Sequence, residues 1–121
     1  MVAEDELVEA GAELLDTLHR RKVDVRAAVW AYDTLFQAWK LVLVLPITSR
    51  IGIKKTYERI EKVLPKNSPI SGVDLQVFYP DSQYAEALQQ SLRGMTNRRL
   101  RHLYLNSDDS YIEDGYVYFV K

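Results

Sequence analysis

The amino-acid sequence predicts an α+β domain in which helices pack on a five-stranded mixed or antiparallel sheet. Three observations lead to this prediction. Segments with a helical period alternate with segments of period two, 47% of the residues are hydrophobic against 27% charged, and 121 residues suffice for one hydrophobic core. We therefore treat residues 1–121 as a single domain with the element order α-β-β-α-β-α-β-β.

The first segment, Glu4 to Arg21, predicts a helix. Its acidic residues lie in the first half and its basic residues at the end, which suits the helix dipole. The apolar positions are three or four residues apart, so they share one face: Leu7, Gly11, Leu14, Leu15 and Leu18.

Two strands are expected next. From Val23 to Tyr32 apolar residues alternate with others, which predicts a strand with one buried face. The short segment 33–38 then connects it to a second strand. Residues 39–47 are apolar on both faces, which predicts a central strand covered from both sides, with Pro46 near its end.

The middle of the chain predicts a helix and a third strand. Ile53, Tyr57, Ile60 and Leu64 have helical spacing, with Thr48 or Ser49 as N-cap and Pro65 as the stop. After a loop rich in Pro, Ser and Asn, alternation predicts a strand through Val73, Leu75, Val77 and Tyr79.

The last third predicts a helix followed by two strands. Asp81 or Ser82 caps the helix, and Gly94 ends it in a left-handed conformation. Residues 100–105 then form a strand, residues 106–110 a loop, and the tail another strand. Asp114-Gly115 is also a type I′ turn signal, so residues 111–113 could instead pair tightly with 116–118, and the register stays open.

Composition narrows the cellular setting. The absence of cysteine excludes disulfides, thiolate metal sites and cysteine nucleophiles, and favours a reducing cytoplasm. Glu4, Asp5 and Glu6 make the N-terminus acidic where a targeting peptide would be basic. The longest apolar run, 41–47, is about a third of the roughly 20 residues that a membrane span needs, so no membrane contact is expected.

Signals for catalysis are few. His19 lies among basic residues at the end of a helix and is interpreted as a surface residue. His102 is expected to share a strand face with Leu100 and Tyr104, so an enzyme with an unrecognised site near His102 is a second alternative. Residues 106–110 lack the spacing of a calcium loop, and the glycines never cluster. We therefore predict no catalytic residue, metal or cofactor.

Basic residues concentrate between 50 and 101, where ten of them stand against five acids. Both ends of the chain are acidic, and the net charge is −1. A basic helix 50–66 and the basic cluster 98–101 define a first alternative, a nucleic-acid-associated protein, although the net charge disfavours it. A basic outer face is also typical of a solvated helix. The candidate contacts are Lys55, Arg59, Lys62, Lys66, Arg98, Arg99 and Arg101.

Aromatic residues give the leading interpretation. Trp30 is expected in the core, whereas Tyr111, Tyr116 and Tyr118 line the β-rich tail and are the candidate interface residues. The sequence therefore favours a small cytoplasmic, non-enzymatic binding or regulatory module that acts through a protein partner or as a homodimer.

Overall fold

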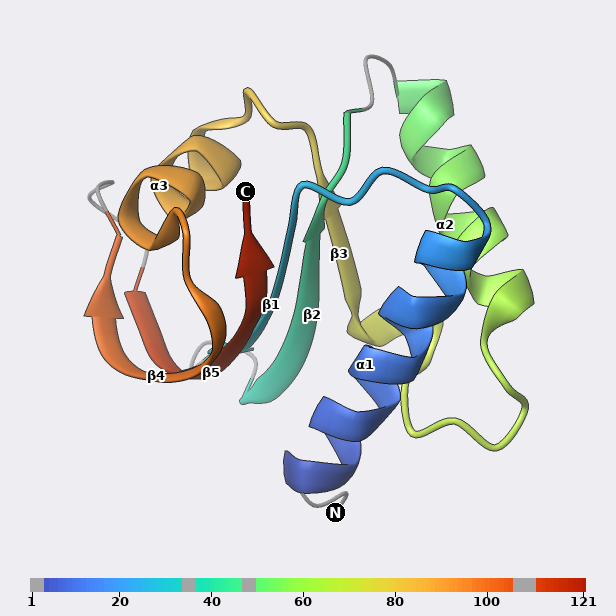
Figure 1. Ribbon diagram of the computed structural model, residues 1–121, viewed down its shortest axis with the longest axis horizontal. Helices are drawn as coiled ribbons and strands as arrows, with labels where there is room; N and C mark the ends of the chain where they lie inside the picture. The colour runs from blue at the N-terminus through green and yellow to red at the C-terminus, as the bar shows by residue number, and fades with distance from the viewer. Residues whose placement is uncertain (1–3, 34–36, 47–49, 106–110) are drawn as a thin grey trace.

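A computed structural model describes residues 4–33, 37–46, 50–105 and 111–121 (Figure 1). These residues form an α+β fold in the predicted order of elements. The elements are α1 (Glu4–Arg20), β1 (Ala27–Asp33), β2 (Ala38–Val44), α2 (Arg50–Val63), the 3₁₀ turn η1 (Gly72–Asp74), β3 (Leu75–Phe78), α3 (Gln83–Leu92), β4 (Thr96–Tyr104) and β5 (Tyr111–Val120).

The five strands form one mixed sheet in the order β3-β2-β1-β5-β4. β2 and β3 are parallel, because α2 carries the chain back across the sheet between them. The neighbours β1–β2, β1–β5 and β4–β5 are antiparallel. β1 is thus the middle strand, and β3 and β4 are the two edges.

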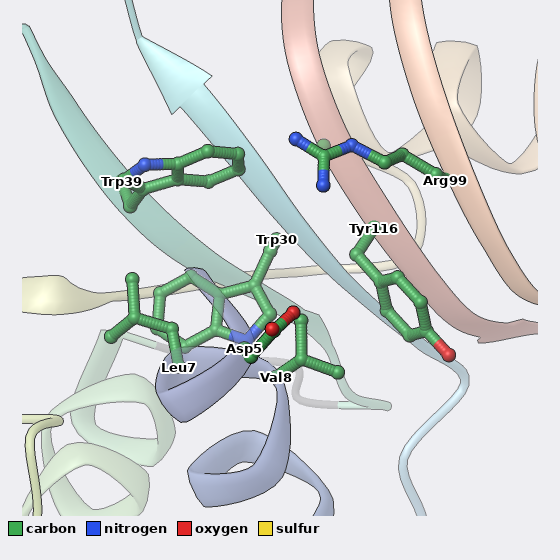
Figure 2. A pocket seen from close by; sticks show the side chains of 8 residues that line it. Asp5, Leu7, Val8, Trp30, Trp39, Arg99 and Tyr116 are labelled. Atoms are coloured by element: carbon green, nitrogen blue, oxygen red, sulfur yellow. The ribbon is translucent and has the colours of Figure 1, made fainter. Parts of the chain in front are cut away.

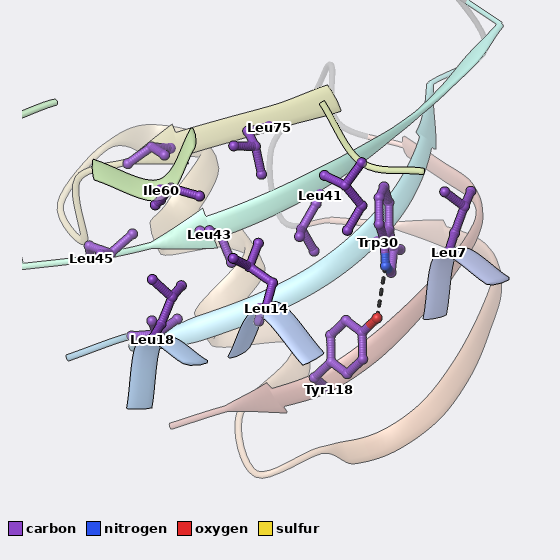
Figure 3. Packing of buried hydrophobic residues seen from close by; sticks show 14 residues of the cluster. Leu7, Leu14, Leu18, Trp30, Leu41, Leu43, Leu45, Ile60, Leu75 and Tyr118 are labelled. Atoms are coloured by element: carbon purple, nitrogen blue, oxygen red, sulfur yellow. Dashed lines mark hydrogen bonds between the residues drawn. The ribbon is translucent and has the colours of Figure 1, made fainter. Parts of the chain in front are cut away.

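Helices cover the sheet from both sides (Figure 1). α1 and α2 lie on one face, over a cluster that contains Leu14, Trp30, Leu43 and Ile60 (Figure 3). α3 lies on the other face, where Leu88 packs in a second cluster of mostly aliphatic side chains. Within the described ranges, no helix combines the length and the apolarity that a membrane span requires.

The first strand was predicted to begin at Val23 and to have one buried face, and both predictions are wrong. β1 begins at Ala27, and its residues 27–31 are buried on both faces because α1 covers one side and α3 the other. Trp30 is in the core, as expected, with 1% of its surface exposed. β2 is covered from both sides, also as expected, but it lies next to the middle strand.

The third strand is shorter than its alternation suggests. Val73 belongs to η1 and is exposed, and β3 covers only four residues. Two end signals in the following segment are confirmed: the Ser82 side chain accepts a hydrogen bond from the Ala85 N–H at 3.2 Å, and Gly94 has a φ of +84°. The predicted caps Thr48 and Ser49 and the loop 106–110 lie outside the described residues.

The C-terminal hairpin resolves the open register. β5 runs through Asp114-Gly115 without turning, so the tight hairpin at this dipeptide does not form. The expected face of His102 is wrong: its φ of +50° interrupts the alternation of β4, so Leu100 and Leu103 both join the α3 cluster and His102 is exposed.

Candidate functional site: an aromatic pocket

A pocket opens on the α1 side of the sheet, between the first turns of α1 and the strands β4 and β5 (Figure 2). Its lining comes from five elements that are far apart in the sequence. The lining residues are Asp5, Leu7 and Val8 of α1, Trp30 of β1, Trp39 of β2, Arg99 of β4, and Gly115 and Tyr116 of β5.

The strand register brings the aromatic residues together. Tyr116 lies opposite Trp30 on one side and opposite Arg99 on the other, so the three side chains form one row across β1, β5 and β4. Trp39 is two residues before Leu41, the partner of Trp30 in β2, and therefore lies diagonally next to Trp30 on the same face. Trp39 also packs edge-on against Tyr32, with ring centroids 5.5 Å apart.

The floor of the pocket is held by a short hydrogen-bond chain (Figure 3). The Trp30 indole N–H donates to the Tyr118 Oη at 2.8 Å, and the Tyr118 hydroxyl donates to the Val8 carbonyl at 2.6 Å. Burial raises the pKa of Tyr118, so its hydroxyl keeps this proton. Because these two hydrogen bonds connect α1 with β1 and β5, they fix the orientation of the Trp30 ring.

Two irregularities make this chain of contacts fit. The pairing of β1 with β5 shifts between Ala28 and Val29, and this bulge leaves Tyr118 as an additional residue whose side chain points to α1. On α1, a Cβ added at Gly11 would overlap the Tyr118 hydroxyl and approach Trp30. Gly11 therefore lets the helix come close enough for the hydrogen bond to Val8.

One wall of the pocket is charged. Arg99 reaches from β4 across β5 (Figure 2), and its Nη2 and Nε donate to the two carboxylate oxygens of Asp114 at 2.8 and 3.3 Å. Asp114 Oδ1 also accepts a hydrogen bond from the Gly115 N–H at 2.9 Å. The pair is partly exposed, at 42% for Arg99 and 23% for Asp114, so it orients the guanidinium more than it stabilises the fold.

The size of the pocket limits what it can hold. Its volume is about 150 Å³. Pockets for drug-sized ligands and cofactors measure about 300–1,000 Å³, whereas a cavity of about 150 Å³ accommodates a molecule of the size of benzene. One ring or one branched aliphatic side chain therefore fits, and a nucleotide does not.

The predicted interface tyrosines have three different environments. Tyr118 is buried, and its hydroxyl is hydrogen-bonded to Trp30 and Val8. Tyr116 is half-buried and lines the pocket. Tyr111 is exposed near the far end of the hairpin, 4.6 Å from the ring centroid of Tyr104. Tyr104 itself is 77% exposed, which strand alternation did not indicate because it placed Tyr104 on the same face as Leu100.

His102 lies in the same exposed aromatic group, and its ring stacks on that of Tyr111 with centroids 6.3 Å apart. Its Nδ1 is 2.6 Å from the Tyr111 hydroxyl. Desolvation first, and then Tyr104 and Glu113, raise the pKa of Tyr111, so the phenol stays protonated at neutral pH. Among the residues that the structure describes, no three His, Asp or Glu side chains come together as metal ligands.

The predicted basic residues do not join into one surface. Lys55, Arg59, Lys62 and Lys66 are exposed on or just after α2, which packs over β3 at one edge of the sheet. The exposed arginines Arg98, Arg99 and Arg101 belong to β4 at the opposite edge.

A second, larger hollow of about 370 Å³ lies between the end of α1 and the end of β5. Two of its polar side chains have partners: Asp16 pairs with Arg20, and Lys121 lies near Asp24 and over the Phe119 ring. With a single aromatic ring, Phe119, it offers fewer anchoring contacts than the pocket around Trp30.

The fold and the site thus define a small α+β protein with an aromatic pocket on the α1 face of its sheet. Comparison with protein-family models, curated proteins and solved structures gave no match.

Proposed function

We propose that the protein is a small, non-enzymatic binding or regulatory module that holds a protein partner by one ring-sized apolar side chain inserted into the aromatic pocket. The observation that carries this proposal is the composition of the lining: Trp30, Trp39, Tyr116 and an oriented Arg99 around a hollow of about 150 Å³. Tryptophan, tyrosine and arginine are the residues that dominate binding energy at the centres of protein interfaces.

The energy available from such an anchor is sufficient for recognition. Burying about 100 Å² of an apolar side chain contributes about 2.5 kcal/mol at 25 cal/mol per Å². That is the magnitude of an interface hot spot, which typically exceeds about 2 kcal/mol. Because the Trp30 ring is already held by Tyr118, the floor is preorganised and little ordering cost opposes binding.

The volume supports a side-chain anchor over a small-molecule substrate, because the pocket is below the range of cofactor sites. A reducing cytoplasm is the compartment that suits a chain without cysteine.

The test uses a displayed library of random linear peptides as the probe. We expect the selected peptides to share one aromatic or large aliphatic residue, whose replacement by Ala weakens binding by at least tenfold, about 1.4 kcal/mol. Val8→Phe, which fills the pocket from α1, and Tyr116→Ala, which removes one wall, should abolish binding.

The matched control is Tyr104→Ala, which removes an exposed ring outside the pocket and should leave peptide affinity unchanged. Melting curves of all three variants establish that they are folded. Peptides without a common anchor, or equal binding by folded Val8→Phe and the wild type, would contradict the proposal.

A further inference from the structure

A different surface of the molecule, the outer side of α1 and α2, has a charge pattern that the pocket does not explain. On α1 the buried residues Leu7, Gly11, Leu14 and Leu18 face the sheet. The exposed side of α1 carries an acidic row with spacings of four, four and three residues: Asp5, Glu9, Glu13 and Asp16. Over its whole length α1 has six acidic residues and one arginine, a net charge of −5.

α2 has the opposite pattern. Ile60 is buried against the sheet, and Ile53 and Tyr57 are partly buried on the same side. Lys55, Arg59 and Lys62 are all exposed on the outer side, with spacings of four and three residues. The helix has five basic and two acidic residues, a net charge of +3.

The two helices are neighbours on the same face of the sheet and run in roughly opposite directions (Figure 1). Their outer sides therefore form one surface, with an acidic row and a basic row side by side. Within the described residues, no ion pair connects the two rows; Asp16 pairs with Arg20 of its own helix.

From this juxtaposition we propose that two copies of the chain associate through the α1–α2 layer, with the acidic row of each copy against the basic row of the other. A two-fold axis parallel to the helices places α1 of one copy over α2 of its partner and repeats the same contact on the other side. This self-complementarity is what an isologous dimer requires. A polyanion that approached α2 would meet the acidic α1 beside it, so charge complementarity favours a second copy over nucleic acid.

The contact is polar and solvent-exposed, which sets its strength. Each exposed ion pair contributes a factor of about one to five in affinity, and salt screens it over a Debye length of about 8 Å at physiological ionic strength. The dimer should therefore be weak and reversible, and it should dissociate as the salt concentration rises.

The experiment uses two charge-reversed variants of the full chain. The acidic variant carries Lys55→Glu, Arg59→Glu and Lys62→Glu, so both of its rows are acidic. The basic variant carries Glu9→Lys, Glu13→Lys and Asp16→Lys, so both of its rows are basic, and Asp5 in the pocket is retained. All six positions are exposed, and circular dichroism melts show whether the variants remain folded.

Sedimentation velocity at low salt over a range of protein concentrations gives the result. We expect the wild type to dimerise, each variant alone to be monomeric, and the equimolar mixture of the two to form a one-to-one heterodimer, because only the mixture pairs opposite rows. Dimerisation of the wild type should weaken at least tenfold between low and physiological salt.

Three results would overturn the proposal: a wild type that is monomeric at all concentrations, self-association that persists in either variant, or a folded mixture that does not associate. Binding of the wild type to a duplex or single-stranded oligonucleotide, lost in the acidic variant, would assign the basic row to nucleic acid instead. Val8→Phe should dimerise like the wild type, which separates this surface from the pocket.

Discussion

The two faces of the sheet are built differently, and the difference separates what stabilises the protein from what forms its site. On the α3 face, small and aliphatic residues such as Ala85, Leu88 and Val117 fill the core. On the α1 face the core also contains Trp30 and Tyr118, whose polar atoms are satisfied by hydrogen bonds, and the packing ends in an open pocket. A face that needs only apolar contacts can close completely. A face with oriented aromatic rings and polar groups can support recognition.

The largest effect is expected on the α3 face. Leu88 is fully buried, so Leu88→Ala should destabilise the fold by about 2–5 kcal/mol through lost contacts and a residual cavity. Urea unfolding gives the change in free energy. If the two faces are independent, the folded fraction of this variant should still bind a pocket peptide with wild-type affinity, and a lost affinity would show that the two faces are coupled.

A smaller effect is expected at Gly115, where the backbones of β5 and β1 approach closely. A Cβ at this position would lie 2.5 Å from the Trp30 carbonyl oxygen, so Gly115→Ala should cost about 1–3 kcal/mol and should also displace Trp30 and weaken peptide binding. Gly94→Ala is the control. Nothing lies within 4 Å of its added Cβ, so only the positive φ costs stability, about 1–2 kcal/mol, and binding should not change.

The smallest effect on stability should accompany a clear effect on the site. Tyr118→Phe leaves the Trp30 N–H and the Val8 carbonyl without their partner, which should cost about 1–2 kcal/mol. Because the Trp30 ring loses the hydrogen bond that orients it, the tryptophan emission band should broaden and the affinity for the pocket peptide should fall. Tyr104→Phe, at an exposed position, should change neither quantity, and equal behaviour of the two variants would show that the hydrogen-bond chain does not position the pocket.

Local patterns in the sequence predicted the order of elements, because helical and strand periods, the Ser82 cap and the Gly94 stop act within a few residues. The pocket was not predictable in this way. It joins Asp5, Trp30, Trp39, Arg99 and Tyr116 through pairings of strands that are distant in the chain, and sequence spacing carries no information on such pairings.

Single residues account for the errors. His102 adopts a positive φ that strand alternation does not reveal. The prediction that His102 shares a face with Leu100 was therefore wrong. Asp114-Gly115 has the composition of a turn, yet Asp114 holds Arg99 and Gly115 permits the close approach to Trp30. Tyr118, interpreted as an interface residue, lies in the core because α1 packs over it and the Val8 carbonyl accepts a hydrogen bond from its hydroxyl.

If the aromatic pocket receives a single ring, as we propose, it should bind N-acetyl-phenylalanine amide, and a titration followed by NMR measures this binding. The chain has two tryptophans and both line the pocket, so their indole N–H resonances report on its occupation. We expect saturable shifts of both resonances and of the Gly115 amide, with a dissociation constant in the millimolar range, about −4 kcal/mol, and no saturable shift with N-acetyl-glycine amide. Shifts confined to Tyr104 and Tyr111, or no saturable shift of either indole, would contradict it.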